Sequence, residues 1–318
     1  MLNDEMKSCC SASRSQISSK DIIKIERIAA ASEEKSIRFY EKMIFIEGGE
    51  FLMGTNDQEG VEADCEGPVK KERVNSFYMD SHVVTNEEFR QFIQETGYRT
   101  EAEGFGWSFV FYQFISPSLN AVMQQVTGTP WWFAVEGAYW FQPEGPGSTI
   151  ENRMDHPVIH VSWNDAMAFC NWAGKRLPTE KEWEFAARGG LEQTKYPWGN
   201  ELIPEDKHHC NIWQGKFPTA NTMEDGYAGT APARSFPPNG YGLYNMAGNV
   251  WEWCTNAFTP SPEAVLPAGQ EPNRAMRGGS YLCHESYCNR YRVAARTSNT
   301  IDSSAGNIGF RCISDQLL

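Results

Sequence analysis

Two cysteines near the C-terminus have the residue type and spacing that redox or metal chemistry needs. Cys283 and Cys288 are separated by four residues in the segment R-G-G-S-Y-L-C-H-E-S-Y-C, which begins at Arg277. Thiols this close, among polar side chains, can share one soft metal ion or one redox event. Spacing alone also fits a structural disulfide or two inert buried thiols. A zinc site that includes His284 is a third interpretation, and it is one ligand short of a tetrahedral set.

The C-terminal segment closely resembles the catalytic stretch of formylglycine-generating enzymes, the oxidases that activate sulfatases. Further motifs extend the resemblance over about residues 43–312, among them H-P-V-I-H-V-S-W-N-D-A, W-A-G-K-R-L-P-T-E-K-E-W-E and P-P-N-G-Y-G-L-Y-N-M-A-G-N-V-W-E-W. Several of these occur across the wider sulfatase-modifying-factor superfamily and therefore indicate the fold alone. The thiol pair is the specific feature, because many relatives that share only the fold lack it.

The resemblance implies a copper-dependent oxidase. Cys283 and Cys288 would hold copper as Cu(I), a soft ion that accepts thiolates, and the substrate cysteine would join as a third thiolate. Dioxygen would be the oxidant, hydrogen would leave the substrate Cβ, and the resulting thioaldehyde would hydrolyse to the aldehyde of formylglycine. Ser280 and Tyr287 match family positions that line this pocket. No organic cofactor is expected, because the chain has no P-loop and no G-x-G-x-x-G after a strand.

Two loops match structural calcium sites of the family. The residues of the first are Asn211, Ile212, Asp225 with Gly226, and Tyr227, and those of the second are Asn245, Gly248, Val250 and Glu252. Calcium takes oxygens from carboxylates, amides and main-chain carbonyls, which irregular loops leave available. No EF-hand spacing occurs, so without the resemblance these segments would be interpreted as solvated turns.

The resemblance implies an α/β (α+β) fold with little regular secondary structure, the sulfatase-modifying-factor fold that is distantly like C-type lectins, and the Gly- and Pro-rich composition agrees with it. Residues 1–42 are expected to form a partly mobile N-terminal segment with one amphipathic helix over residues 22–40, and residues 43–318 the catalytic domain. Strands are predicted on both sides of Gly48-Gly49 and from Phe77 to Asp80. Helices are predicted to begin at three N-caps and to end at Ile93, Ala173 and Arg188 respectively; the caps are Thr85, Ser162 and Thr179. Beyond Gly190 the chain is expected to be nearly all turns.

Composition limits the partners. The net charge of -13 argues against nucleic acid, whose phosphates require Lys and Arg, and suits a basic partner such as an Arg-containing peptide. No apolar run is long enough to span a bilayer, and the polar N-terminus lacks the apolar core of a signal peptide. Nine cysteines is an odd number, so at least one is free or bonded to another molecule, and in a reducing compartment most would be thiols. We expect a cytoplasmic monomer that acts on unfolded sulfatase chains and contacts no membrane.

The other cysteines are expected to be structural. The resemblance places Cys170 and Cys312 at positions that pair in eukaryotic relatives, although two packed thiols are at least as good an interpretation in a reducing compartment. A second pair of those relatives falls on Ala187 and Val293, where both cysteines are missing. Cys65, Cys210 and Cys254 carry no functional signal.

Two alternative functions share this fold. A non-catalytic, lectin-like binding module would have no use for the thiol pair. An iron-dependent oxidase of the ergothioneine-biosynthesis type would carry an additional helical domain with three His ligands, and the residues before Met43 are too few and contain no His.

The N-terminus contains a possible substrate mimic. Sulfatases are modified at Cys-x-Pro/Ala-x-Arg, and the stretch Cys10-Ser11-Ala12-Ser13-Arg14 fits that pattern. One hypothesis is a tethered pseudosubstrate that occupies the peptide cleft. The alternative is a chance match of three fixed positions among common residues.

Overall fold

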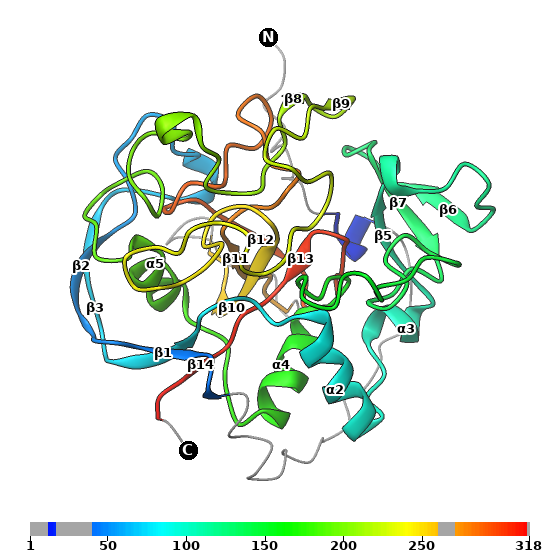
Figure 1. Ribbon diagram of the computed structural model, residues 1–318, viewed down its shortest axis with the longest axis horizontal. Coiled ribbons are helices and arrows are strands. Elements are labelled where there is room, and N and C mark those ends of the chain that lie inside the picture. Colours follow the sequence, from blue (N-terminus) through cyan, green and yellow to red (C-terminus); the bar gives the residue numbers. More distant parts are fainter. Residues whose placement is uncertain (1–11, 17–39, 260–270, 317–318) are drawn as a thin grey trace.

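The computed structural model describes residues 12–16, 40–259 and 271–316, and these form a mixed α/β structure of short elements joined by long connections (Figure 1). The helices are α2 (Asn86–Thr96), α3 (Glu101–Phe105), α4 (Trp163–Trp172) and α5 (Glu180–Arg188), with 3-10 turns η1 (Arg14–Gln16), η2 (Glu62–Asp64), η3 (Tyr112–Phe114) and η4 (Pro204–Asp206). This architecture confirms the predicted fold class. The helix expected over residues 22–40 lies outside the described residues, apart from Tyr40 at its end.

The strands gather into several small sheets. They are β1 (Met43–Ile46), β2 (Gly49–Met53), β3 (Lys70–Val74), β4 (Phe77–Asp80), β5 (Trp107–Phe111), β6 (Val122–Gln125), β7 (Trp132–Glu136), β8 (Gly215–Lys216), β9 (Ala220–Asn221), β10 (Trp251–Ala257), β11 (Arg274–Arg277), β12 (Arg296–Asn299), β13 (Ile308–Gly309) and β14 (Ile313–Ser314). In hydrogen-bonded order the sheets are β1-β4-β14, β2-β3, β5-β7-β6, β8-β9 and β12-β11-β10-β13. The last of these lies at the centre of the molecule in Figure 1.

The helix boundaries follow from capping chemistry. Thr85, Ser162 and Thr179 are the predicted N-caps, and each forms a capping box with the acidic residue three positions later. Helix α2 continues to Thr96, three residues beyond the predicted end, and stops at Gly97 in the left-handed region. Helix α5 ends at Arg188 as predicted, because Gly189 adopts φ 56° and terminates it.

One expectation needs correction. The strands on either side of Gly48-Gly49 are confirmed, and β1 pairs with β4 while β2 pairs with β3. The expectation that the chain beyond Gly190 is nearly all turns is wrong, because β10 to β13 form the central sheet there. Residues 251–254 of β10 are all buried, so the charged Glu252 does not mark a solvent-facing side of the strand.

The C-terminal segment is held by buried ion pairs with earlier parts of the chain. Its guanidinium groups are at most 13 % exposed and face carboxylates that are at most 14 % exposed. The pairs are Arg277 with Glu184 (2.5 Å), Arg290 with Asp64 (2.5 Å), Arg292 with Glu66 (2.6 Å), Arg296 with Glu180 (2.6 Å) and Arg311 with Glu252 (2.8 Å). Buried charges are tolerated only when paired and hydrogen-bonded, so these contacts determine where residues 277–311 can lie.

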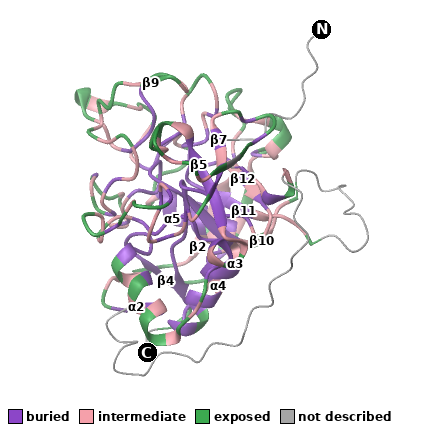
Figure 2. Ribbon diagram, turned by 90° about the vertical axis from the view of Figure 1, so that its right-hand side faces the viewer, coloured by how far each residue is buried: buried purple, intermediate pink, exposed green. Residues whose placement is uncertain are grey.

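The main apolar cluster is largely aromatic and includes the thiol pair together with Ala12 from the N-terminal segment. Figure 2 shows the central strands β10 and β11 as buried. Within the described parts of the chain, no helix has the length and apolar character needed to cross a membrane.

A carboxyl pair joins the starts of α3 and α4. The backbone N–H of Glu101 donates to the Asp165 carboxylate (3.0 Å), and the Asn164 side-chain amide donates to Glu101 (2.9 Å). Burial, followed by repulsion from Asp165, raises the pKa of Glu101 from 4.5 to about 8. Burial also raises the pKa of Asp165.

We expect folding stability to fall as the pH rises. The folded pKa of Glu101 is above its ordinary value, so its stabilising contribution is complete below about pH 4.5 and is lost as pH rises towards about 8. Glu101→Gln should make the melting temperature less dependent on pH between 5 and 9, as measured by thermal unfolding. Glu87→Gln, at an exposed position of α2, is the charge-matched control and should leave the wild-type dependence unchanged. Equal pH dependence in wild type and Glu101→Gln would contradict this assignment.

Candidate active site

A glycine pair turns the chain from β11 into the thiol loop. Gly278 and Gly279 have φ values of 94° and 76°, a region that glycine adopts without steric penalty. A Cβ on Gly279 would lie 2.9 Å from the Arg290 carbonyl oxygen, so a side chain there would push the loop away from residues 290 and 291. The two glycines therefore allow the residues that follow to pack closely against the end of the same loop.

The structure brings Cys283 and Cys288 into direct contact. Their sulfur atoms are 2.9 Å apart, and the residues are 0 % and 3 % exposed. The loop folds back because the backbone N–H groups of Tyr287 and Cys288 both donate to the His284 carbonyl, at 3.0 and 2.8 Å. A disulfide has an S–S length of about 2.05 Å, so this is a contact between two thiols. The arrangement offers two soft donors inside an apolar cluster.

Ser280 contacts one of the two thiols. Its backbone N–H donates to Cys283 Sγ (3.4 Å), and its hydroxyl accepts from the side-chain amide of Asn307 (3.1 Å). Asn307 comes from the stretch between β12 and β13, and sequence reasoning missed it. Its only sequence signal is its place in the polar run S-S-A-G-N of the C-terminal segment.

Tyr287 forms part of an aromatic wall beside the thiols. Its ring stacks on Phe217 at a centroid distance of 4.6 Å and meets Trp131 edge to face at 4.7 Å. Both partners come from distant loops and were not anticipated. They occur in P-W-W and K-F-P, where an aromatic next to proline is the only hint. The tyrosine ring is therefore fixed by packing.

His284 does not complete a metal cluster. Its Nδ1 lies 2.8 Å from the Ser286 hydroxyl on the same turn. Among residues 12–16, 40–259 and 271–316, no three His, Cys, Asp or Glu side chains gather as a metal site. The zinc interpretation thus gains no support.

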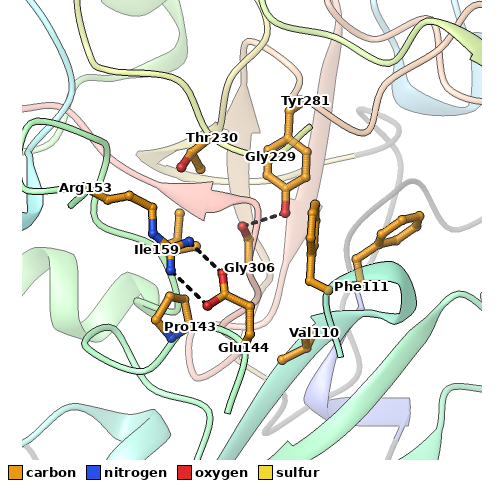
Figure 3. Close-up of a pocket in the computed structure, with 11 residues that line it drawn as sticks. Val110, Phe111, Pro143, Glu144, Arg153, Ile159, Gly229, Thr230, Tyr281 and Gly306 are labelled. Atoms are coloured by element: carbon orange, nitrogen blue, oxygen red, sulfur yellow. Dashed lines mark hydrogen bonds and ion pairs between the residues drawn. The ribbon is translucent and has the colours of Figure 1, made fainter. Parts of the chain in front are cut away.

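A cavity of about 190 Å³ adjoins the site (Figure 3). Tyr281 and Gly306 line it, and the Tyr281 hydroxyl donates to the Gly306 carbonyl at 2.9 Å. The ion pair between Arg153 and Glu144, at 2.6 Å, lies on its opposite side. The hydrogen bond from Tyr281 to Gly306 links the thiol loop to the segment that contains Asn307.

The main apolar cluster contains a second pair of cysteines. Cys170 and Cys312 are close together, with sulfur atoms 3.5 Å apart, and burial raises the pKa of Cys312. Ala187 and Val293 both lie in the second apolar cluster, where Cys254 also lies.

The first predicted calcium loop gathers several oxygen atoms. The Ile212 carbonyl and Asp225 Oδ2 both accept from the side-chain nitrogen of Gln214, the latter at 2.9 Å. Asn211 Oδ1 and Gln214 Oε1 are buried without a hydrogen-bond partner among the described residues. Burial raises the pKa of Asp225. Rotation of the Gln214 side-chain amide by 180° would exchange its nitrogen and oxygen. Its oxygen would then face the Ile212 carbonyl and Asp225 Oδ2, so three oxygens would converge. These groups fit a cation.

The second predicted calcium set is arranged differently. Both Glu252 oxygens accept from Arg311, at 2.8 and 2.9 Å, and one of them also accepts from the Trp183 indole at 2.8 Å. Asn245 Oδ1 is buried and, within the described residues, has no partner. Glu252 would have to share its carboxylate between an ion and Arg311, so this set fits a cation less well than the first. Gln214 and Arg311 were both missed because their carboxylate partners are distant in the sequence.

Comparison with known proteins identifies the family to which this chain is similar. The profile of the sulfatase-modifying factor enzyme 1-like domain matches residues 29–316. The chain is 57 % identical over 284 residues to the formylglycine-generating enzyme of Thermomonospora curvata, covering 86 % of this chain and 94 % of that protein. It is 49 % identical to the inactive C-alpha-formylglycine-generating enzyme 2 of Mus musculus, covering 86 % and 85 % of the two chains.

A solved structure shares the fold at lower identity. PvdO from Pseudomonas aeruginosa superposes with a TM-score of 0.60 at 22 % identity, over 86 % of this chain and 94 % of that one. Identity this low indicates the fold alone. The family profile and the close relatives carry the assignment: the chain belongs to the sulfatase-modifying factor family, among the proteins related to formylglycine-generating enzymes.

Proposed function

We propose that this protein oxidises the cysteine of a Cys-x-Pro/Ala-x-Arg sulfatase motif to Cα-formylglycine. The observation that carries the proposal is the buried contact between Cys283 and Cys288, at 2.9 Å, in a chain closely related to formylglycine-generating enzymes. The overall change removes two electrons and two protons from the CH2–SH group, one hydrogen from carbon and one from sulfur, and water then replaces sulfur as hydrogen sulfide leaves. Dioxygen accepts the two electrons and two protons, which reduces it to hydrogen peroxide.

The thiol pair suits copper. Two thiols with little solvent exposure are soft donors of the kind that select Cu(I). The sulfur atoms are in contact, so an ion between them requires the two side chains to move apart. When bound, copper would supply the one-electron chemistry with dioxygen that thiols alone perform poorly.

The chain's own residues would orient the reacting groups and exclude water. The Ser280 N–H points at Cys283 Sγ and stabilises a thiolate there. Asn307 fixes the Ser280 hydroxyl, which leaves that hydroxyl positioned to bond an oxygen species. Both thiols are buried, and the rings of Phe217 and Trp131 fix Tyr287, the residue next to Cys288.

A non-catalytic binding module is the alternative, and the inactive mouse relative shows why family membership alone does not decide. Such a module needs no pair of buried, touching thiols, so the pair favours the oxidase. A cytoplasmic location, which would keep both cysteines reduced, is part of this proposal.

We expect turnover to require copper and dioxygen. A peptide containing Cys-Thr-Pro-Ser-Arg should lose its thiol and gain an aldehyde, as followed by mass spectrometry, only when both are supplied. Copper restored to the stripped protein should recover the rate, whereas zinc should not. Equal turnover after rigorous removal of copper would contradict the copper mechanism.

We expect Cys283→Ser and Cys288→Ser each to abolish turnover without unfolding the protein, because one thiolate holds Cu(I) poorly. Thermal unfolding and copper titration separate lost folding from lost binding. Cys254→Ala removes a buried thiol from the second cluster and is the matched control, which should retain activity. Normal copper affinity and activity in Cys288→Ser would argue against shared ligation.

We also propose structural calcium in the two predicted loops, with the stronger support in the first. The converging oxygens of Ile212 and Asp225 and the unpartnered Asn211 Oδ1 lie in loops that have few ladder hydrogen bonds. A cation would neutralise Asp225 and offset the unfavourable burial of its charge.

We expect chelation to lower the melting temperature, because an ion bound only to the folded state stabilises it by mass action. Asp225→Asn should remove most of this shift, and Glu252→Gln should remove a smaller part. Addition of Ca²⁺ to the chelated wild type should restore the original melting temperature. No effect of chelation, with no calcium found by elemental analysis, would leave these loops as ordinary turns.

A further inference from the structure

A short N-terminal segment is packed into the catalytic domain. Of its residues, Ala12 and Arg14 are 0 % and 3 % exposed, whereas Ser13 is half-buried and Ser15 is exposed. The Asn299 side-chain amide donates to the Ala12 carbonyl at 2.9 Å, and the Arg14 backbone N–H donates to the Ser303 hydroxyl at 2.8 Å. The two buried residues occupy the Pro/Ala and Arg positions of the sulfatase motif. Burial is thus complete at these two fixed positions and only partial at Ser13, the variable position between them.

Arg14 fills a pocket made for a guanidinium group. Its Cζ lies 4.1 Å from the ring centroids of both Phe105 and Trp107, which gives two cation–π contacts. Its Nε donates to the Asp302 carbonyl at 2.8 Å, and its Nη2 donates to the Trp107 carbonyl at 2.9 Å. Planar stacking combined with directed N–H donors selects arginine over lysine.

The electrostatics of the pocket are also favourable. Burial lowers the pKa of Arg14 to about 10, while the nearby carboxylates of Asp302, Glu101 and Asp165 act in the opposite direction. Nη1 of Arg14 has no hydrogen-bond partner among the described residues. Arg14 therefore stays charged inside the pocket and uses only part of its hydrogen-bonding capacity there.

The pocket lies within reach of the thiol pair. Figure 1 shows the short dark-blue turn η1 beside β5 and close to β13. Ser304, whose hydroxyl accepts from Arg14 Nη2 at 3.2 Å, is followed after three residues by Asn307, which donates to Ser280 next to the thiols. Three residues span at most about 11 Å, and the side chains of Asn307 and Ser280 lengthen this path to the thiols. The four steps from Cys to Arg in the motif span at most about 14 Å, and the arginine side chain lengthens that path as well. The two paths are of comparable length, so a peptide with its arginine in this pocket would extend towards the pair.

We infer that residues 12–16 are an internal ligand of the peptide-binding surface, and that Arg14 occupies the pocket which recognises the arginine of an incoming Cys-x-Pro/Ala-x-Arg chain. This inference rests on the proposed function for the identity of the incoming peptide. A substrate must displace Arg14 before it binds, so the tether lowers the apparent affinity of every arginine-containing substrate. Cys10, the remaining fixed position of the match, lies outside the described residues.

The size of the effect follows from the tether. A segment joined by a short linker has an effective concentration of about a millimolar, so an intrinsic affinity of about 100 μM would keep the pocket filled roughly ten times out of eleven. Removal of Arg14 should then strengthen peptide binding about tenfold. The turnover number should not change, because Arg14 touches neither thiol.

The test is peptide binding without copper, measured by fluorescence anisotropy under reducing conditions. The probes are a labelled peptide containing Cys-Thr-Pro-Ser-Arg and a matched peptide that ends this motif in Gln. The proteins are wild type, Arg14→Ala, Arg14→Lys, and a deletion of residues 1–16. Arg90→Ala, at an exposed position of α2, removes the same charge elsewhere and is the control.

We expect Arg14→Ala and the deletion to bind the Arg peptide about tenfold more tightly than wild type, with Arg14→Lys intermediate and Arg90→Ala unchanged. The Gln peptide should bind every one of these proteins more weakly than the Arg peptide does, because it cannot fill the arginine pocket. Equal affinity of wild type and Arg14→Ala for the Arg peptide would overturn the inference. So would weaker binding together with a lowered melting temperature, because segment 12–16 would then be a structural brace.

The two proposals can fail separately. If the Arg peptide binds Arg14→Ala more tightly and is never oxidised, the internal ligand stands and the oxidase proposal fails. If wild type and Arg14→Ala oxidise the peptide with the same Michaelis constant, the oxidase stands and the internal ligand is rejected.

Discussion

The pairing of C-terminal arginines with buried carboxylates is the interaction on which the rest of this structure depends. Arg277, Arg292 and Arg311 are each 3 % exposed or less and are matched by Glu184, Glu66 and Glu252 from three earlier segments. A guanidinium cannot lose its proton in a protein, and an unpaired buried charge costs about 3–5 kcal/mol. The segment between Arg277 and Arg311 is therefore fixed at several points. The ion pairs hold loops that have few strand-to-strand hydrogen bonds of their own in a single arrangement. The thiol pair lies on one of these loops.

This framework explains how a loop-rich chain can hold the thiol pair in place. The Gly278-Gly279 turn and the fold-back at His284 bring the two sulfur atoms together, while Ser280 donates to Cys283 and is itself held by Asn307. Asn307 ends a stretch in which Asp302 and Ser304 provide a carbonyl and a hydroxyl group to Arg14. One continuous stretch thus connects the pocket that holds Arg14 with the thiol pair, which is the relation that the proposed linear substrate motif requires.

Features determined by residues close together in the sequence were predicted well. Features that depend on contacts between distant segments were not. The caps at Thr85, Ser162 and Thr179 were readable because a capping box is complete within four residues. The same signal at Thr100 and Glu103 marks α3, which was not predicted. Strand β10 was not recognised, because its charged residue Glu252 is buried with its apolar neighbours and marks no solvent-facing side. In the candidate site, sequence spacing and family resemblance indicated Cys283 and Cys288. Asn307 and Phe217 meet Ser280 and Tyr287 only through tertiary contacts, and Gln214 meets Asp225 across a separation of 11 residues.

The central claim is that Cys283 and Cys288 form one bis-thiolate copper site that accepts a substrate thiol. X-ray absorption at the copper edge, on protein loaded with one equivalent of Cu(I), tests it most directly. The account predicts a shell of two sulfur ligands in the protein alone and a third sulfur when the Cys-Thr-Pro-Ser-Arg peptide is added. A shell of nitrogen and oxygen, or a sulfur number that does not change with peptide, would contradict it.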